Sequence, residues 1–446
     1  MLAEVWAFGY SGRMIGRMSG RMRVKRAMRR AASGFAYKNG ELYCDAVAAR
    51  TIADAVGTPA YVYLSPSILA RYREFQKAFG KYPHLICYSV KSNANLGILR
   101  RLARRKAGFD IVSGGELYRV LKAGGKASRT VFSGVGKTAA EMDYALREGV
   151  LLFNCESESE LRLLSERAAR LGKRARVGLR VNPHVDAATH PYIHTGLTEH
   201  KFGIEMEAAE ELYREAQSWP GLRVEGLSCH IGSQIMDLAP FGEAVEKLVA
   251  MAARLRKAGM AVRYLDAGGG LAASYKAEDK PPPIRAYCRQ LLRCVRGSGL
   301  KLVVEPGRAL VAEAGILLTR VVHVKSTGKK RFVIVDAAMN DLIRPSLYGA
   351  YHEVRPVARN PKKSRAEVVT DLVGPVCETG DFLARGRRLA AVEQGELLAI
   401  FTAGAYGFVL SSNYNARPRP AEVLVEGRRW TVARKRETLR DLVRGE

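Results

Sequence analysis

One lysine, Lys91, stands at the point where an apolar run of the chain gives way to a turn. The run 85–90 has the length and apolar character of a buried strand, and residues 92–95 are typical of a turn. Burial disfavours the ammonium form and lowers a lysine pKa, so we expect this amine to be a nucleophile toward an aldehyde. The alternative is a solvated lysine of the kind that strand ends often carry. The rest of the chain decides between these two interpretations.

Polar residues and glycines close most of the other apolar runs as well. Because residues at the carboxyl ends of barrel strands converge on one mouth, we expect these side chains to surround one site. Alongside Lys91 they include Asp110, Ser113–Glu116, Asn154, Asn182, His230, Asp266 and Glu305. This convergence, more than any single motif, indicates one active site.

Three consecutive glycines, Gly268, Gly269 and Gly270, follow one apolar run and precede a helix-like segment. Their backbone N–H groups can approach a phosphate closely because no side chain intervenes. A tight turn would explain the same glycines. We therefore treat them as a candidate phosphate site that needs support from neighbouring residues.

Glu305 closes the last run of the series, and burial would oblige its carboxylate to find a cationic partner. Arg308 is one candidate for that partner, and a protonated pyridine nitrogen is another. A lysine amine, a phosphate site and a carboxylate together are what pyridoxal phosphate requires. His230 could stack on the cofactor ring, although a single histidine at a strand end more often has a structural role.

Eight short apolar runs alternate with amphipathic segments of helical length. Eight such units in roughly 220 residues are typical of an α/β fold of the (β/α)8 TIM-type barrel class. A doubly wound open sheet is the competing topology, but it usually has fewer strands and a Gly-rich first turn. The predicted strands are 85–90, 109–112, 130–132, 151–154, 176–181, 224–229, 262–267 and 302–305.

Beyond Arg308, runs rich in Val, Ile and Thr are separated by turn residues, which predicts a C-terminal all-β domain of barrel or sandwich type. An Asn39-Gly40 pair predicts a hairpin, and we expect residues 35–57 to pack on that domain. The predicted division is a barrel at 60–310 and a β domain formed by 35–59 and 311–446. We expect residues 1–33 to be a basic tail, either disordered or the product of an overextended start.

The net charge of +28, from 72 Lys and Arg against 44 Asp and Glu, raises the question of nucleic-acid binding. No zinc-finger spacing or aromatic-interleaved basic stripe accompanies the charge, so we expect non-specific adhesion to polyanions and no specific nucleic-acid partner.

The seven cysteines include no CxxC pair, which indicates reduced thiols and a cytoplasmic protein. No apolar stretch reaches 18 residues, so we expect no membrane span.

Six motifs occur in order between Tyr88 and Gly407, and the resemblance that they carry covers the chain from Phe35 to about Val432. They are Tyr88-Ser-Val-Lys91-Ser-Asn93, His230-Ile-Gly-Ser-Gln234, Gly268-Gly-Gly270, Glu305-Pro-Gly-Arg308, Cys377-Glu-Thr-Gly-Asp381 and Gly404-Ala-Tyr406-Gly407. Together they resemble the fold-type III pyridoxal phosphate-dependent decarboxylases, and most closely the members that act on diaminopimelate. The resemblance implies an alanine racemase-like fold and pyridoxal 5'-phosphate as the cofactor.

The resemblance also implies a role for each matching residue around the cofactor. Lys91 would bind the aldehyde, His230 would stack on the ring, and Glu305 would pair with the ring nitrogen. The phosphate would be surrounded by Ser233, Gly268, Gly269, Gly270, Gly307 and Tyr406. No metal is implied, and we expect none at the loop histidines His184, His190 and His194, whose spacing is loop-like.

For the substrate, the resemblance implies loss of carbon dioxide from the D-centre of meso-2,6-diaminopimelate to give L-lysine, the last step of lysine biosynthesis. The end that does not react would be bound by Arg308, Arg344, Tyr348, Glu378 and Tyr406. Cys377 would reprotonate the carbanion, since a thiol with a pKa near 8.5 is a reasonable acid at neutral pH. Cys377 and Glu378 would come from the partner subunit of a homodimer.

Two alternatives stay open from the sequence. Sister enzymes on the same scaffold act on ornithine, arginine or carboxynorspermidine, but such substrates would favour an acidic pocket where this chain has Arg344 and Tyr348. A non-catalytic binding protein would be expected to lack Lys91, Glu305 or Cys377, and all three are present.

Overall fold

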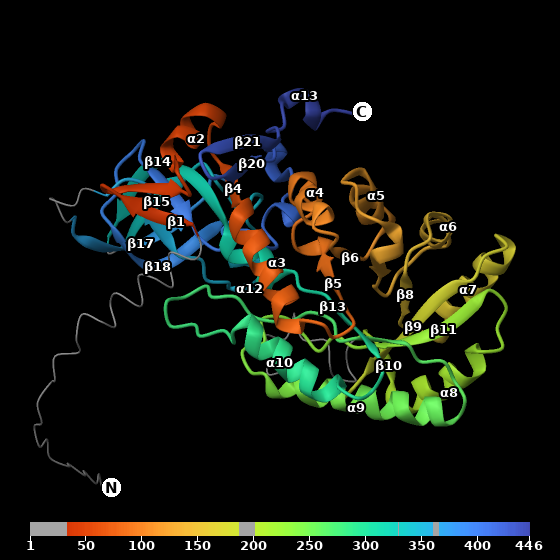
Figure 1. The fold of residues 1–446 in the computed structure, drawn as a ribbon. Helices are drawn as coiled ribbons and strands as arrows, with labels where there is room; N and C mark the ends of the chain where they lie inside the picture. The colour runs from red at the N-terminus through yellow and green to blue at the C-terminus, as the bar shows by residue number, and fades with distance from the viewer. Residues whose placement is uncertain (1–33, 187–200, 329, 360–364) are drawn as a thin grey trace, which may run out of the picture.

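The computed structural model describes residues 34–186, 201–328, 330–359 and 365–446. These residues form a barrel ringed by helices and a β-rich domain beside it (Figure 1). The tail predicted at 1–33 lies outside the described residues, and its expected disorder or overextended start stays a prediction.

Eight parallel strands form a closed barrel, in which the last strand pairs with the first. Each of the eight predicted apolar runs coincides with one of these strands, so the predicted barrel is confirmed and the open sheet is excluded. The strands are β5 (His84–Ser89), β6 (Gly108–Ile111), β7 (Thr130–Phe132), β8 (Leu152–Cys155), β9 (Ala175–Asn182), β11 (Leu222–Ser228), β12 (Tyr264–Asp266) and β13 (Lys301–Val304). A short strand, β10 (Ile204–Glu205), extends the sheet beside β9.

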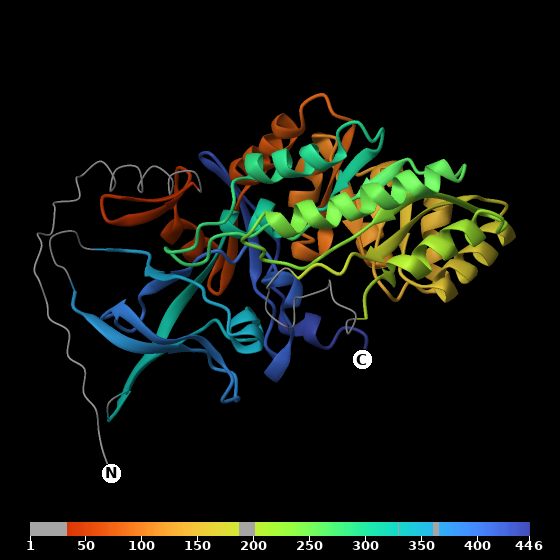
Figure 2. The same ribbon diagram turned by 90° about the horizontal axis from the view of Figure 1, so that it is seen from below.

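Helices surround the barrel, and several begin only a few residues after a strand ends. The side chains of Asn95, Ser113, Thr138 and Ser157 accept hydrogen bonds from backbone N–H groups at the starts of four helices. These caps stabilise the helix starts and keep the connecting loops short. The helices are α3 (Ser65–Phe79), α4 (Leu96–Arg104), α5 (Gly114–Lys122), α6 (Ala139–Glu148), α7 (Glu158–Arg170), α8 (Met206–Ala216), α9 (Ala239–Lys257) and α10 (Ile284–Val295). Helix α3 packs against α10 and completes the ring (Figures 1 and 2).

The β-rich domain is built on one large, mainly antiparallel sheet, and the predicted all-β C-terminal domain is thereby confirmed. Its strand order is β18-β17-β15-β14-β4-β20-β21, with β19 and β16 attached through β14. The strands are β4 (Ala60–Leu64), β14 (Gly315–Thr327), β15 (Lys330–Val335), β16 (Val354–Pro356), β17 (Glu367–Val373), β18 (Phe382–Ala390), β19 (Leu397–Ile400), β20 (Ala421–Glu426) and β21 (Arg429–Arg434).

Strand β4 moves one predicted boundary. The barrel was expected to begin at residue 60, but β4 pairs with β14 and β20 of the β-rich sheet. The barrel therefore begins after this strand, with α3 and β5. The apolar run 60–64 is buried in either arrangement, so its sequence pattern alone does not identify the sheet to which it belongs.

The chain before β4 folds onto the β-rich domain. Strands β1 (Phe35–Lys38), β2 (Glu41–Cys44) and β3 (Val47–Ala48) form a small sheet, and Asn39 and Gly40 make the predicted hairpin turn with positive φ angles of 50° and 81°. Helix α2 (Ala49–Val56) follows. Side chains of this segment share a hydrophobic cluster with β4, β14 and β20, which ties the two parts of the domain together.

Two further properties concern the chain as a whole. No helix in the described ranges is long and apolar enough to cross a membrane. All seven cysteines are free thiols, and five of them are buried.

Candidate active site

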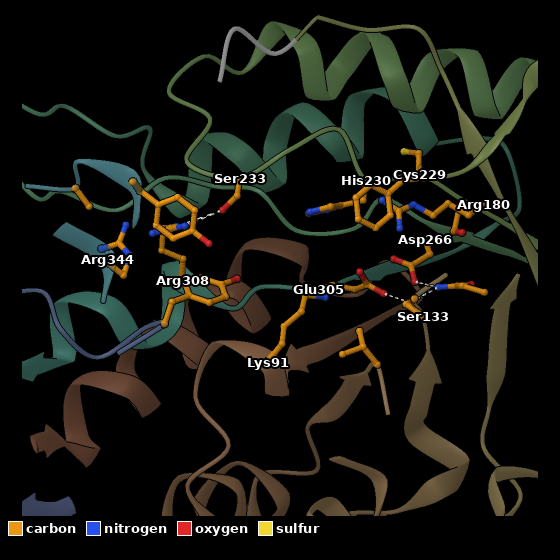
Figure 3. A pocket seen from close by; sticks show the side chains of 18 residues that line it. Lys91, Ser133, Arg180, Cys229, His230, Ser233, Asp266, Glu305, Arg308 and Arg344 are labelled. Atoms are coloured by element: carbon orange, nitrogen blue, oxygen red, sulfur yellow. Dashed lines mark hydrogen bonds between the residues drawn. The ribbon is translucent and has the colours of Figure 1, made fainter. Parts of the chain in front are cut away.

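A cavity of about 380 Å³ lies at the carboxyl ends of the barrel strands, facing the β-rich domain. Figure 3 shows Lys91 and Glu305 between a pair of arginines, Arg308 and Arg344, and a group that includes His230 and Asp266. The predicted site residues that line this cavity are Lys91, His230, Ser233, Glu305, Arg308, Arg344, Tyr348 and Tyr406. A smaller adjoining cavity adds Gly269, Gly270 and Gly307. The structure therefore brings together most of the residues that were predicted separately.

Lys91 lies in the single helical turn Val90–Ser92 after β5, and its Nζ is 2.7 Å from Oδ2 of Asp110 on the next strand. Burial by itself lowers the pKa of this ammonium. The carboxylates of Asp110 and Glu305, with the hydrogen bond to Asp110, outweigh burial and raise the pKa. The expected lowering of the Lys91 pKa is thus wrong for the free chain, because an acid on the neighbouring strand stabilises the charged form.

Glu305 follows β13 and lies among other buried acids. Burial and the charges of Asp110 and Asp266 raise the pKa of Glu305 well above its usual range. The Ser133 hydroxyl donates a hydrogen bond to Glu305 Oε1 (3.2 Å), and Asn154 Nδ2 donates to both Ser133 Oγ and Asp266 Oδ2. A buried carboxylate in this setting favours a ligand that brings a positive charge or a hydrogen-bond donor.

The ring of His230 is neutral and lines the cavity. Burial lowers its pKa well below the usual value, and the charges of Arg180 and Lys91 add to this effect. The Gly269 N–H donates to His230 Nδ1 (3.2 Å), so the proton of the neutral ring is assigned to Nε2. An uncharged, fixed imidazole presents a flat face against which a planar cofactor can stack.

The predicted glycines are required by close packing of the backbone. A Cβ atom on Gly269 would lie 2.4 Å from the Glu305 carbonyl oxygen, and one on Gly270 would lie 2.7 Å from that of Gly232. Gly268 (φ +65°) packs against Cys229 and His230 in the same way, without lining either cavity. Close packing therefore explains these glycines without a ligand, and the backbone of two of them still borders the smaller cavity.

Arg308 and Arg344 are both buried, and their hydrogen-bond acceptors are neutral. Arg308, at the start of α11 (Arg308–Val311), donates to Ser233 Oγ and to the Tyr275 hydroxyl. Arg344, at the start of α12 (Arg344–Tyr348), contacts His352 Nε2 at 2.9 Å. In the described part of the chain, no carboxylate forms an ion pair with either guanidinium. Two uncompensated cations make this end of the cavity a site for an anion.

Tyr406 reaches the cavity from the β-rich domain. Its φ is +56°, in the left-handed region that side-chain-bearing residues rarely occupy, and its N–H donates to Ser92 O (2.8 Å). The Arg308 guanidinium lies 4.9 Å from the centre of the Tyr406 ring. Such strain is often found at functional sites, where surrounding contacts maintain it.

Cys377 and Glu378 do not line the cavity of their own chain. Both are exposed, in the loop between β17 and β18. The Cys377 N–H donates to Asn415 Oδ1 (2.8 Å), and the Tyr414 hydroxyl donates to Glu378 Oε2 (3.3 Å). Asp381 holds the loop from inside, because its carboxylate accepts hydrogen bonds from the backbone N–H groups of Met339 and Val376.

Two lining residues, Asn154 and Asp266, were expected at this site from the strand-end pattern but were given no role. Ser133 was missed, although it directly follows β7, so the same pattern carried a signal for it. Arg180 lies within β9, where its Nη1 pairs with Glu156 Oε1 (2.8 Å), and no motif marked it. Tyr275 and His352 contact the two arginines from loops, and no feature of their spacing would have identified them.

No group of three or more His, Cys, Asp or Glu side chains in the described ranges could hold a metal ion. His184 is described, and its Nε2 contacts the Glu205 carboxylate. His190 and His194 lie outside the described residues, so the expectation of no metal at the three histidines stays a prediction.

The sequence of this chain is similar to one family of known proteins. Residues 65–312 match the family described as "Pyridoxal-dependent decarboxylase, pyridoxal binding domain". A diaminopimelate decarboxylase of Pseudomonas fluorescens is 53% identical over 413 residues, which are 92% of this chain and 98% of that protein. A diaminopimelate decarboxylase of Vibrio cholerae is 50% identical over 406 residues, 91% of this chain and 96% of that protein.

Solved structures agree with the sequence relatives. The crystal structure of diaminopimelate decarboxylase from Helicobacter pylori complexed with L-lysine superimposes with a TM-score of 0.85 at 42% identity. That match covers 89% of this chain and 98% of the other. A diaminopimelate decarboxylase from M. jannaschii in complex with L-lysine gives a TM-score of 0.86 at 36% identity, covering 92% and 96% of the two chains.

Proposed function

The chain belongs to the diaminopimelate decarboxylase family of pyridoxal-dependent decarboxylases, and from this premise we propose that it acts on meso-2,6-diaminopimelate. The reaction removes the carboxylate of the D-centre as carbon dioxide and leaves L-lysine, as the last step of lysine biosynthesis. The observation that carries this proposal is the pair of buried arginines in the same cavity as Lys91 and Glu305. We expect the reaction to take place in the cytoplasm, where thiols stay reduced, since all seven cysteines are free.

The residues of the cavity fit pyridoxal 5'-phosphate, the cofactor of this family. When bound, it accepts electrons from the bond that breaks at the substrate α-carbon. Lys91 would hold its aldehyde carbon, His230 would lie against its ring, and the Glu305 carboxylate would face its ring nitrogen. The residues that would surround its phosphate are Ser233, Gly269, Gly270, Gly307 and Tyr406, whereas Gly268, also expected there, lines neither cavity. Ser233 accepts from Arg308 and therefore keeps its own O–H to donate.

The acid cluster suits this cofactor for an electrostatic reason. Burial and two neighbouring carboxylates raise the pKa of Glu305, so the isolated site favours a proton there. A ring nitrogen beside Glu305 can share that proton, which offsets the cost of burying the carboxylate. Asp110, on β6, holds the Lys91 amine in place, with Oδ2 of Asp110 2.7 Å from Nζ of Lys91.

Arg308, Arg344 and Tyr348 would hold the carboxylate of the substrate centre that does not react. Diaminopimelate has an amino-acid group at each end, so one end must be fixed while the other reacts. Ornithine, arginine and carboxynorspermidine, the substrates of the alternative decarboxylases, present a cationic or neutral group there. Two uncompensated guanidiniums disfavour such a group and favour a carboxylate.

The acid and the distal ammonium site would come from a second subunit. Cys377 and Glu378 are exposed and outside the cavity of their own chain, yet Asp381 holds their loop in a defined conformation. We infer a homodimer in which each loop completes the partner's cavity. Cys377 Sγ would then deliver the proton to the carbon that has lost carbon dioxide, and Glu378 would bind the distal ammonium.

Carbon dioxide release by the purified protein, supplied with cofactor, tests the proposal. We expect kcat/KM for meso-diaminopimelate to exceed that for ornithine or arginine by at least about 100-fold, because a site built for a charged group rejects analogues that lack it. Lys91→Ala should abolish the release and serves as the control for contaminating enzymes. Release from ornithine but not from diaminopimelate would favour the alternative decarboxylase.

A further inference from the structure

The two cavity arginines are held in place by a second layer of neutral side chains. Arg308 donates to the Tyr275 hydroxyl, and Arg344 contacts His352 Nε2 at 2.9 Å. Both guanidiniums also lie against the Tyr275 ring, at 5.7 Å for Arg308 and 4.6 Å for Arg344 from its centre. Neither Tyr275 nor His352 carries a charge that would cancel that of an arginine.

Hydrogen bonds fix His352 as an acceptor toward Arg344. Its Nδ1 lies 2.8 Å from the Phe401 carbonyl oxygen, which can only accept, so Nδ1 carries the proton. Nε2 is then left with a lone pair that faces Arg344 Nη1. The side chain is fully buried, and burial with the Arg344 charge lowers its pKa to about 3. His352 is therefore neutral throughout the physiological pH range.

A contact between Tyr275 and His352 joins the two arginines across the domain boundary. Tyr275 follows β12 of the barrel, whereas His352 belongs to the β-rich domain. Their rings meet edge to face, with centres 5.4 Å apart and planes at 89°. Tyr275, which binds Arg308, therefore also contacts His352, which binds Arg344.

Neutral acceptors have a consequence that carboxylates would not. A carboxylate paired with Arg344 would satisfy the guanidinium and cancel its charge before any ligand arrived. A neutral imidazole or phenol fixes the geometry and leaves the positive charge to be neutralised by the ligand.

We propose that Tyr275 and His352 are positioning residues that hold Arg308 and Arg344 through neutral contacts, and so set the preference for a ligand with a distal carboxylate. This inference rests on the proposed function, in which those arginines bind the carboxylate that is retained in L-lysine. Tyr275 and His352 act through the arginines and do not touch the substrate.

Two variants of equal shape separate charge from packing. His352→Gln keeps a neutral acceptor, whereas His352→Glu places a carboxylate against Arg344. We call Arg308 and Arg344, with Tyr275 and His352, the clamp. Titration calorimetry of the cofactor-loaded enzyme measures the affinity of the clamp for a carboxylate without a reaction step. The ligands are L-lysine and, as the matched ligand without a carboxylate, cadaverine. We expect His352→Gln to hold lysine affinity within about threefold and His352→Glu to weaken it on the order of 30-fold, with cadaverine affinity changed less than about threefold in both.

Equal effects of the two variants on lysine binding, whether both small or both large, would overturn the inference.

Tyr275→Phe provides a second test that keeps the ring and removes the acceptor for Arg308. It should raise KM for diaminopimelate about tenfold with kcat changed less than about threefold, and an unchanged KM would count against the role of Tyr275. If the unmodified enzyme releases no carbon dioxide from diaminopimelate but still binds lysine more tightly than cadaverine, the proposed function fails and the clamp stands.

Discussion

At the scale of single residues, the acids of the cavity lie at the opposite end from its two arginines that have no ion-pair partner among the described residues (Figure 3). Asp266 and Glu305 lie on the side of Lys91 and Arg180, while Arg308 and Arg344 lie at the other end (Figure 3). Asp110 stands behind Lys91, with its Oδ2 2.7 Å from Nζ. A ligand that fits this layout carries a positive group against the acids and a negative group against the arginines. A pyridinium ring and a distal carboxylate meet that requirement, so the electrostatics favour cofactor and substrate together.

The buried histidine of the clamp should make folding stability depend on pH. Its pKa is about 3 in the folded chain and about 6.5 when unfolded, so the unfolded state binds more protons between these values. The contribution of neutral His352 to the free energy of unfolding is therefore fully present above about pH 6.5 and is lost as the pH drops toward 3. Between pH 7.5 and 5.0 we expect the wild type to lose about 2 kcal/mol of unfolding free energy that His352→Gln does not lose. Urea denaturation at the two pH values measures the difference, and identical losses in both proteins would contradict the assigned neutral state.

The Lys91 environment marks a limit of prediction at this scale. The sequence indicates a buried strand end followed by an amine, and the structure places Lys91 there. The direction of its pKa shift depends on a distance of 2.7 Å to Asp110, nineteen residues further along. Spacing along the chain carries no information about such a distance, so burial alone led to the opposite sign.

At the scale of elements, the barrel strands could be predicted because each is a short apolar run between helical segments. Strand β4 could not be assigned to its sheet, because a run buried on both faces looks the same in either domain. Tyr275 and His352 were missed for a related reason. They lie in loops whose positions are set by packing between the two domains, which no local pattern encodes.

The loop that carries Cys377 and Glu378 depends on one internal carboxylate. Asp381 accepts hydrogen bonds from the N–H groups of Met339 and Val376, each at 2.7 Å. Asp381→Ala would leave both donors without their acceptor, at a cost of about 1–3 kcal/mol each where water cannot replace it. We expect kcat to fall at least about tenfold while the visible absorption of the bound cofactor is retained.

Hydrogen exchange measures whether the loop itself is loosened. The Val376 amide should exchange faster in Asp381→Ala than in the wild type. In Asp381→Asn, which keeps one acceptor oxygen, its exchange rate should lie between those of Asp381→Ala and the wild type. A rate loss accompanied by loss of cofactor would show that Asp381 supports the whole fold, and would contradict the specific role in this loop.

At the scale of the whole molecule, the division into a barrel and a β-rich domain could be predicted, because the spacing of apolar runs changes near residue 310. The orientation of the two domains could not. It decides which loops face the cavity, and it leaves the Cys377 loop outside the cavity of its own chain. The proposed homodimer accounts for that arrangement, because the loop of one copy would then bring Cys377 to the cavity of the other.

Mixing two inactive variants tests the shared site directly. Lys91→Ala disables the cavity, and Cys377→Ala removes the proposed acid, which should cost about 10²–10⁴ in kcat. If random reassociation gives half mixed dimers, each with one intact site, activity should recover to about one quarter of wild type. A mixture of Lys91→Ala with Glu305→Gln is the matched control, since both changes fall in the same cavity and no intact site can form. Recovery in neither mixture would place the reaction within one chain, whereas recovery in the first alone requires that Lys91 and Cys377 of one site come from different subunits.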